Sequence, residues 1–123
     1  MDIAVWIVSG LLAVAYLAAG LMKTFIAKEK LVKNLPWTED YSAGTVRFIG
    51  IAELLGAIGL IAPWLTGIAP ILTPLAAVGL VIVQALAIRT HIRRHEQVIA
   101  NIVLLVLALF VAATRFLQLA GTL

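Results

Sequence analysis

The sequence predicts an all-α integral membrane protein, a four-transmembrane-helix bundle with a short interfacial amphipathic helix between the first two spans. Of its 123 residues, 63% are hydrophobic and only 12% are charged, whereas soluble domains are about 45–50% apolar and about 25% charged. A helical crossing takes roughly 20 residues. The chain therefore has room for four crossings and one longer loop, and residues 1–123 are expected to form one domain.

Four apolar stretches are the candidate spans. They cover approximately residues 3–22, 45–62, 71–90 and 98–118. Pro63, Gly67 and Pro70 indicate a turn between the second and third spans, and Pro74 falls in the first turn of the third, where proline is tolerated. The spans are joined by connections too short to form separate units.

The one longer connection lies between the first two spans. In residues 24–35 lysines are interspersed with apolar side chains, a pattern typical of a short amphipathic helix in the membrane interface. Pro36 is expected to end that helix. Ser42 or Thr45 is expected to cap the next one.

The aromatic and the basic residues together predict the orientation. An aromatic belt at one interface would contain Trp6 and Trp64, and the headgroup level suits Trp37 and Tyr41. The positive-inside rule places the first and third loops in the cytoplasm and both termini outside. A net charge of +3 on so apolar a chain indicates a basic surface facing anionic lipid of the bilayer, and no nucleic acid. The residues of this cytoplasmic-face basic set are Lys28, Lys30, Lys33, Arg47, Arg89, Arg93 and Arg94, with Lys23 at the rim.

Each span carries one face of small and polar residues, because steps of three and four keep side chains on one side of a helix. Small residues let membrane helices approach closely, so we expect these faces to point into the bundle. We expect their polar members to converge in its cytoplasmic half as a buried polar cluster. The five members are Lys23, Glu53, Gln84, His91 and Asn101.

Glu53 is the most informative of these residues, because a carboxylate inside an apolar span is expensive and is either paired or functional. Arg47 lies six residues away on a different helix face, so the partner must come from another helix. Lys23 is the first candidate and His91 the second. One interpretation is purely structural, with the polar side chains fixing helix register. The other is a pocket for the head group of a quinone or another lipophilic molecule, with a proton path as a weaker variant.

Other chemistry finds less support in the sequence. The chain has no cysteine, which excludes a disulfide relay and any Cys-ligated metal or iron–sulfur cluster. His91 and His95 have a spacing that metal or haem sites use, but the neighbouring arginines oppose a cation. No nucleophile–base pair is recognisable, so an autonomous enzyme is not expected. Arg115 is expected to be a snorkelling residue or a belt residue at the outer interface.

Several segments resemble the DoxX-like family of small bacterial membrane proteins. They are GLMK at 20–23, VRFIGIAELLGAIGLIAP at 46–63, PILTPLAAVGL at 70–80, and A-x-x-x-H-x-R-R at 87–94 followed by Asn101. The resemblance implies a four-helix bundle in the bacterial cytoplasmic (inner) membrane. It also implies that Lys23, Arg47, Glu53 and His91 carry the family pattern, while Gln84 stands where an apolar residue is expected.

The resemblance also bears on function. The family takes its name from a subunit of a terminal quinol oxidase, and some members are tied to membrane oxidoreductase complexes. This implies an accessory subunit or quinone-pocket protein linked to membrane redox chemistry, but not oxidase activity, because the chain lacks the internal histidines of a haem–copper centre. Distant eukaryotic relatives look like assembly factors. The alternative is therefore a non-enzymatic scaffold whose partner is another membrane protein or a second copy of the chain.

Overall fold

The computed structural model describes residues 2–122 and contains four long helices, with two short helical segments between the first two. The elements are α1 (Asp2–Phe25), α2 (Lys28–Asn34), the 3-10 helix η1 (Pro36–Asp40), α3 (Ala43–Thr66), α4 (Leu72–Arg93) and α5 (Ile99–Leu119). Each of the four long helices is long and apolar enough to cross a membrane. The predicted all-α class and the four spans are confirmed.

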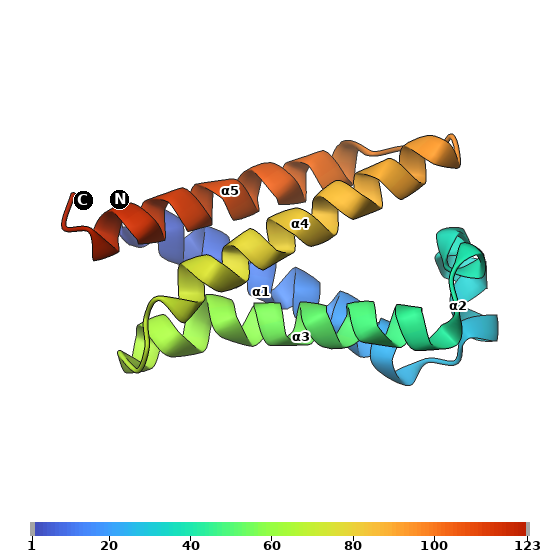
Figure 1. Cartoon of the computed structure of the whole chain (residues 1–123), viewed down its shortest axis with the longest axis horizontal. Helices are drawn as coiled ribbons and strands as arrows, with labels where there is room; N and C mark the ends of the chain where they lie inside the picture. The colour runs from blue at the N-terminus through green and yellow to red at the C-terminus, as the bar shows by residue number, and fades with distance from the viewer. Residues whose placement is uncertain (1, 123) are drawn as a thin grey trace.

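The four long helices run up and down and pack in the cyclic order α1, α3, α4, α5 (Figure 1). The contact between α1 and α3 is the most extensive, and the contact that closes the ring between α5 and α1 is the smallest. Figure 1 shows both chain termini and the α3–α4 turn at one end of the bundle, which we call the terminal end. Residues 26–42 and the α4–α5 link at residues 94–98 form the opposite end.

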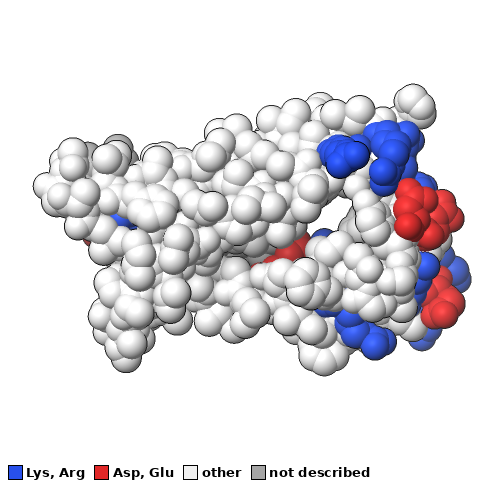
Figure 2. All heavy atoms as spheres, in the orientation of Figure 1, with Lys and Arg blue, Asp and Glu red and all other residues white. Residues whose placement is uncertain are grey.

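Charged side chains are concentrated at this second end, which we call the charged end, while the middle of the molecule is almost entirely uncharged (Figure 2). The α4–α5 pair and the α1–α3 pair diverge towards it (Figure 1). Because the helices splay apart there, the bundle is not closed by its four long helices alone. The short elements α2 and η1 lie at this open end.

The predicted end of the second span is wrong by about one helical turn. The helix α3 does not end before Pro63 but includes it and continues to Thr66. Pro63 cannot donate a hydrogen bond to the Gly59 carbonyl and its ring crowds that carbonyl, yet the helix continues for one more turn. Gly67 ends it by adopting a left-handed φ of 73°.

The interfacial helix is shorter than predicted, because α1 continues to Phe25 and α2 covers only Lys28–Asn34. Pro36 does not only follow the end of α2 but also occupies the first turn of η1, where proline is favoured. Of the two candidate caps of α3, Ser42 is the N-cap, since its hydroxyl accepts a hydrogen bond from the Thr45 N–H at 3.1 Å.

The predicted inward faces of the four spans do point into the bundle. The large apolar side chains that the bundle leaves uncovered lie on the opposite faces, where lipid would contact them. The small and polar residues of the predicted faces that are buried are Ser9, Tyr16, Gly20, Gly50, Glu53, Gly56, Ala57, Ala77, Gln84, Ala108, Ala112 and Arg115.

Glycines set two of the helix separations. A Cβ atom at Gly50 would lie 2.8 Å from the Lys23 Cβ and 2.9 Å from the backbone nitrogen of Thr24, so glycine is what allows α3 to approach α1 here. A Cβ at Gly59 would lie 2.7 Å from the Ala76 Cβ, so glycine also allows α3 to approach α4. These close approaches place the polar residues of neighbouring helices within reach of one another.

Candidate functional site

A cavity of about 950 Å³ lies between the diverging helices at the charged end. Figure 2 shows an opening between the two halves of the molecule in this region, with acidic atoms visible inside the otherwise uncharged middle. All five residues predicted to converge line this one cavity. They are Lys23 from α1, Glu53 from α3, Gln84 and His91 from α4, and Asn101 from α5.

An ion pair between α1 and α3 lies in the cavity wall. The Lys23 Nζ is 2.6 Å from the Glu53 Oε1, and the Glu53 side chain is only 2% exposed. The predicted first partner of Glu53 is thus confirmed. Pairing and hydrogen bonding are what make a buried charge tolerable, and the ammonium also lies 5.3 Å from the centroid of the Trp37 ring.

His91, the second candidate, does not pair with Glu53. Its Nδ1 lies 2.7 Å from the Oε1 of Glu96 in the α4–α5 link. The hydrogen bond from His91 and the bond from Arg94 hold the pKa of the Glu96 carboxyl below its usual value, because both favour the carboxylate. The histidine therefore belongs to the rim of the cavity and not to the buried ion pair.

An amide pair joins α4 to α5 on the other side of the cavity. The Asn101 Nδ2 donates a hydrogen bond to the Gln84 Oε1 at 3.0 Å. This interaction uses the oxygen of Gln84 and not its NH₂ group, which carries two donors. The polar residues thus form two separate interhelical contacts, one between α1 and α3 and one between α4 and α5, that face the same cavity.

Tyr16 on α1 is a cavity residue that the predicted polar cluster did not include. The side chain is 1% exposed and lines the cavity, and its hydroxyl makes no hydrogen bond within 3.5 Å among residues 2–122, although the Gln84 side chain lies close to it. Buried polar groups are normally hydrogen-bonded, so this hydroxyl is a free donor beside the cavity. The signal in the sequence was its spacing of seven from Lys23, which places both on one face of α1.

The segment around η1 covers the aqueous end of the cavity. Leu35, Pro36, Trp37 and Tyr41 all contribute to the lining. The Tyr41 hydroxyl lies 2.7 Å from the Thr90 Oγ1 on α4. The Trp37 ring packs edge-on against Tyr41, with centroids 5.8 Å apart. The sequence did not indicate that these two aromatic residues line the cavity.

Arg94, in the α4–α5 link, forms ion pairs with η1. Its guanidinium lies 3.0 Å from a carboxylate oxygen of Glu39, 3.0 Å from one of Asp40 and 3.2 Å from one of Glu96. These hydrogen bonds raise the pKa of Arg94, because they favour the charged form. Of the predicted basic set, Arg94 is therefore engaged within the protein, while Arg89 and Arg93 line the cavity.

Of the two roles expected for Arg115, snorkelling is wrong, because its side chain has no exposed surface. It packs instead against Trp6 and Trp64, the two tryptophans of the predicted aromatic belt. The guanidinium carbon lies 4.2 Å from the centroid of the Trp64 ring and 4.7 Å from that of Trp6, and the Nη1 donates to the Gln118 Oε1 at 2.8 Å. Two indole rings from α1 and α3 retain the guanidinium, because cation–π attraction is strongest where water is excluded.

The fold and the cavity define a small multi-pass membrane protein whose helices splay apart at one end around a polar cavity with a cover. The model of the DoxX-like family matches residues 7–113, which include all five predicted cavity residues. The chain belongs to the DoxX-like family. Comparison with curated proteins and comparison with solved structures each give no match.

Proposed function

We propose that this protein binds the head group of a lipophilic molecule of the quinone class in the cavity at the charged end, as an accessory protein of membrane redox chemistry. The observation that carries the proposal is the unpaired, buried hydroxyl of Tyr16 in a wall that also presents Lys23 and Gln84. Family membership supports a small membrane protein, and the quinol oxidase subunit after which the family is named favours a quinone over other lipophiles.

The chemistry of the cavity suits an uncharged head that accepts hydrogen bonds. A quinone presents carbonyl oxygens, and the hydroxyl of Tyr16, the ammonium of Lys23 and the NH₂ group of Gln84 are donors. Glu53 balances the charge of Lys23 at 2.6 Å, so the wall does not demand an ionised ligand. The volume of about 950 Å³ falls within the range of small-molecule sites, about 300–1,000 Å³.

Removing the Tyr16 hydroxyl tests this proposal. Tyr16→Phe should weaken the binding of a benzoquinone probe by about two- to tenfold, the usual worth of one hydrogen bond. It should change the stability of the protein little, because the hydroxyl makes no hydrogen bond within 3.5 Å inside the protein. Binding can be followed by quenching of tryptophan fluorescence, since Trp37 lines the cavity.

Ser9→Ala is the matched control. Ser9 lies on the same helix and is buried with an unpaired hydroxyl, yet it does not line the cavity. Its removal should leave probe binding unchanged. Equal effects of the two substitutions, or none from Tyr16→Phe, would contradict a head-group site at Tyr16.

We further propose that the charged end faces the cytoplasm of a bacterium and that both termini lie outside, in agreement with the positive-inside rule. The chain has no cysteine, so single cysteines can report the topology. A membrane-impermeant maleimide applied to intact cells should modify Gly121→Cys at the terminal end and spare Lys30→Cys at the charged end. The reverse pattern would show the opposite orientation.

The alternative function, a scaffold for a membrane protein partner or a homodimer, finds less support in the glycine contacts. Added Cβ atoms at four glycines would meet other parts of the bundle at 2.7–2.8 Å, so these glycines already serve internal packing. They are Gly20, Gly50, Gly56 and Gly59. Among the helical glycines of the described residues, Gly10 and Gly79 face open space close to the helix surface, which leaves little glycine-lined surface for a partner helix.

A further inference from the structure

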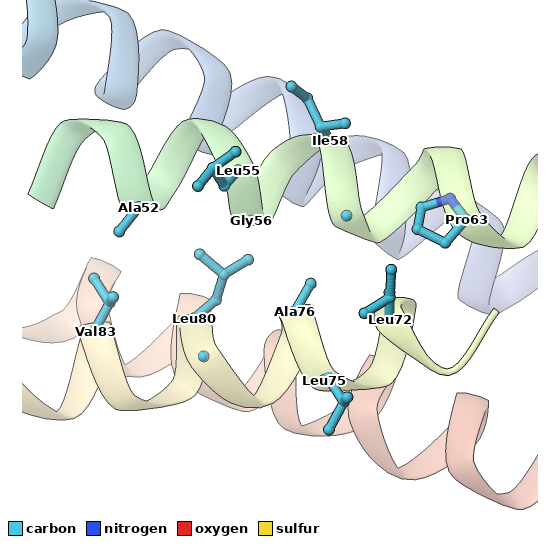
Figure 3. A pocket seen from close by; sticks show the side chains of 12 residues that line it. Ala52, Leu55, Gly56, Ile58, Pro63, Leu72, Leu75, Ala76, Leu80 and Val83 are labelled. Atoms are coloured by element: carbon cyan, nitrogen blue, oxygen red, sulfur yellow. The ribbon is translucent and has the colours of Figure 1, made fainter. Parts of the chain in front are cut away.

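A second hollow lies on the lipid-facing side of the bundle. It is an apolar groove of about 560 Å³ between α3 and α4. Figure 3 shows Ala52 on α3 and Val83, Leu80 and Ala76 on α4 pointing into the gap between the two helices. Leu55 is 65% exposed and Ile58 57% exposed, so the groove opens to where lipid would lie.

The groove and the polar cavity adjoin each other. Ala52 on α3 and Val83 on α4 line both, and they lie at the end of the groove nearest the charged end. The cavity in turn includes Phe48 and Ile82, which are 72% and 56% exposed. The cavity therefore also reaches the lipid-facing surface along the seam between α3 and α4.

The dimensions of the groove match one apolar chain. Along α3 it extends from Ala52 to Pro63, about 16 Å at 1.5 Å per residue. One leaflet of the hydrocarbon core is about 15 Å thick. A chain that starts at Ala52 would run parallel to the helices, away from the charged end, as lipid chains run in a leaflet.

We propose that the ligand of the cavity is a single-chain amphiphile whose polar head occupies the cavity and whose prenyl or acyl chain lies in the α3–α4 groove. This inference rests on the proposed function, since it assigns the rest of the same molecule. The head enters from the membrane between α3 and α4, because Phe48 and Ile82 line the cavity there and are exposed to where lipid would lie. At the charged end η1 lies across part of the cavity, held by the ion pairs of Arg94.

A substitution at one glycine can block the groove without changing the cavity. Gly79 lines the groove, and a Cβ added there would meet no atom within 4 Å. Gly79→Leu therefore fills the groove without disturbing the packing of α3 against α4. Gly10→Leu is the matched control, because Gly10 is also helical with open space around it and lines neither hollow.

The first measurement is native mass spectrometry of the protein extracted together with its own lipids. The unsubstituted chain and Gly10→Leu should retain one amphiphile per chain, and Gly79→Leu should lose it. The mass identifies the source, a prenyl quinone or an acyl lipid. The second measurement compares a benzoquinone with a decyl chain and the same benzoquinone without a chain, by quenching of tryptophan fluorescence.

In the second measurement Gly79→Leu should weaken the binding of the decyl probe about tenfold or more. Each methylene group that can no longer be buried in the groove lowers the affinity several-fold. It should leave the chainless probe unchanged, and Gly10→Leu should leave both unchanged. If Gly79→Leu spares the decyl probe and the retained amphiphile, the chain assignment is wrong while the head site stands. If Tyr16→Phe has no effect on either probe, or the unsubstituted chain binds neither and retains nothing, both proposals fail.

Discussion

Glu53→Leu is expected to destabilise the bundle by about 3–5 kcal/mol, because it leaves the buried ammonium of Lys23 without its partner. The Nζ and Oε1 atoms are 2.6 Å apart, and the Lys23 side chain is only 11% exposed. Lys23→Met should cost a similar amount, since it leaves the carboxylate unpaired. The double substitution should cost clearly less than the sum, because it removes both charges together.

Reversible unfolding in mixed detergent, followed by helical circular dichroism, gives these three free energies. Arg94 and Glu39 provide a matched exposed pair, with Glu39 55% exposed. Glu39→Leu should change stability by less than about 1 kcal/mol, as is usual for exposed ion pairs. If the losses of unfolding free energy from the Lys23 and Glu53 substitutions were strictly additive, the ion pair would contribute no coupling energy to stability.

Glu53→Gln separates stability from ligand binding. The amide keeps the volume of the side chain and can still accept a hydrogen bond from Lys23, so the bundle should stay folded. The uncompensated ammonium changes the charge of the cavity, and retention of the native amphiphile should be lost. A folded Glu53→Gln protein with unchanged retention would show that the ion pair is structural only.

Helix periodicity made part of the site predictable. Lys23 and Glu53 could be matched because each lies on the small-residue face of its span, and faces with steps of three and four must meet inside a bundle. The same argument brought Gln84 and Asn101 together. These contacts are fixed by the geometry of regular helices, so a sequence pattern is sufficient to predict them.

The cover of the cavity was not predictable in this way. Trp37 and Tyr41 line the cavity because residues 26–42 fold back over the open end, and this depends on the ion pairs of Arg94 with an element 54 and 55 residues away in sequence. Such long-range contacts leave no periodic signal. The unpaired state of the Tyr16 hydroxyl also depends on the three-dimensional surroundings and not on spacing.

The position of Arg115 was also not predictable from the sequence, because its two tryptophan neighbours come from different helices.

Substitution of Arg115 should have the second large effect on stability. Arg115→Ala should destabilise the protein by about 3 kcal/mol or more, since it removes two desolvated cation–π contacts and leaves a void between α1, α3 and α5. Arg115→Lys should recover only part of this loss, because an ammonium lacks the planar surface that stacks between two rings.

The same unfolding assay measures these variants, and the emission of Trp6 and Trp64 should shift to longer wavelength as water reaches the rings. Arg47→Ala is the control, an exposed arginine whose removal should change stability by about 0.5 kcal/mol or less. Arg115→Met separates volume from charge, because it fills the space without the guanidinium. We expect it to remain less stable than the unsubstituted protein. Equal stability would show that filled volume, and not cation–π attraction, joins the three helices at the terminal end.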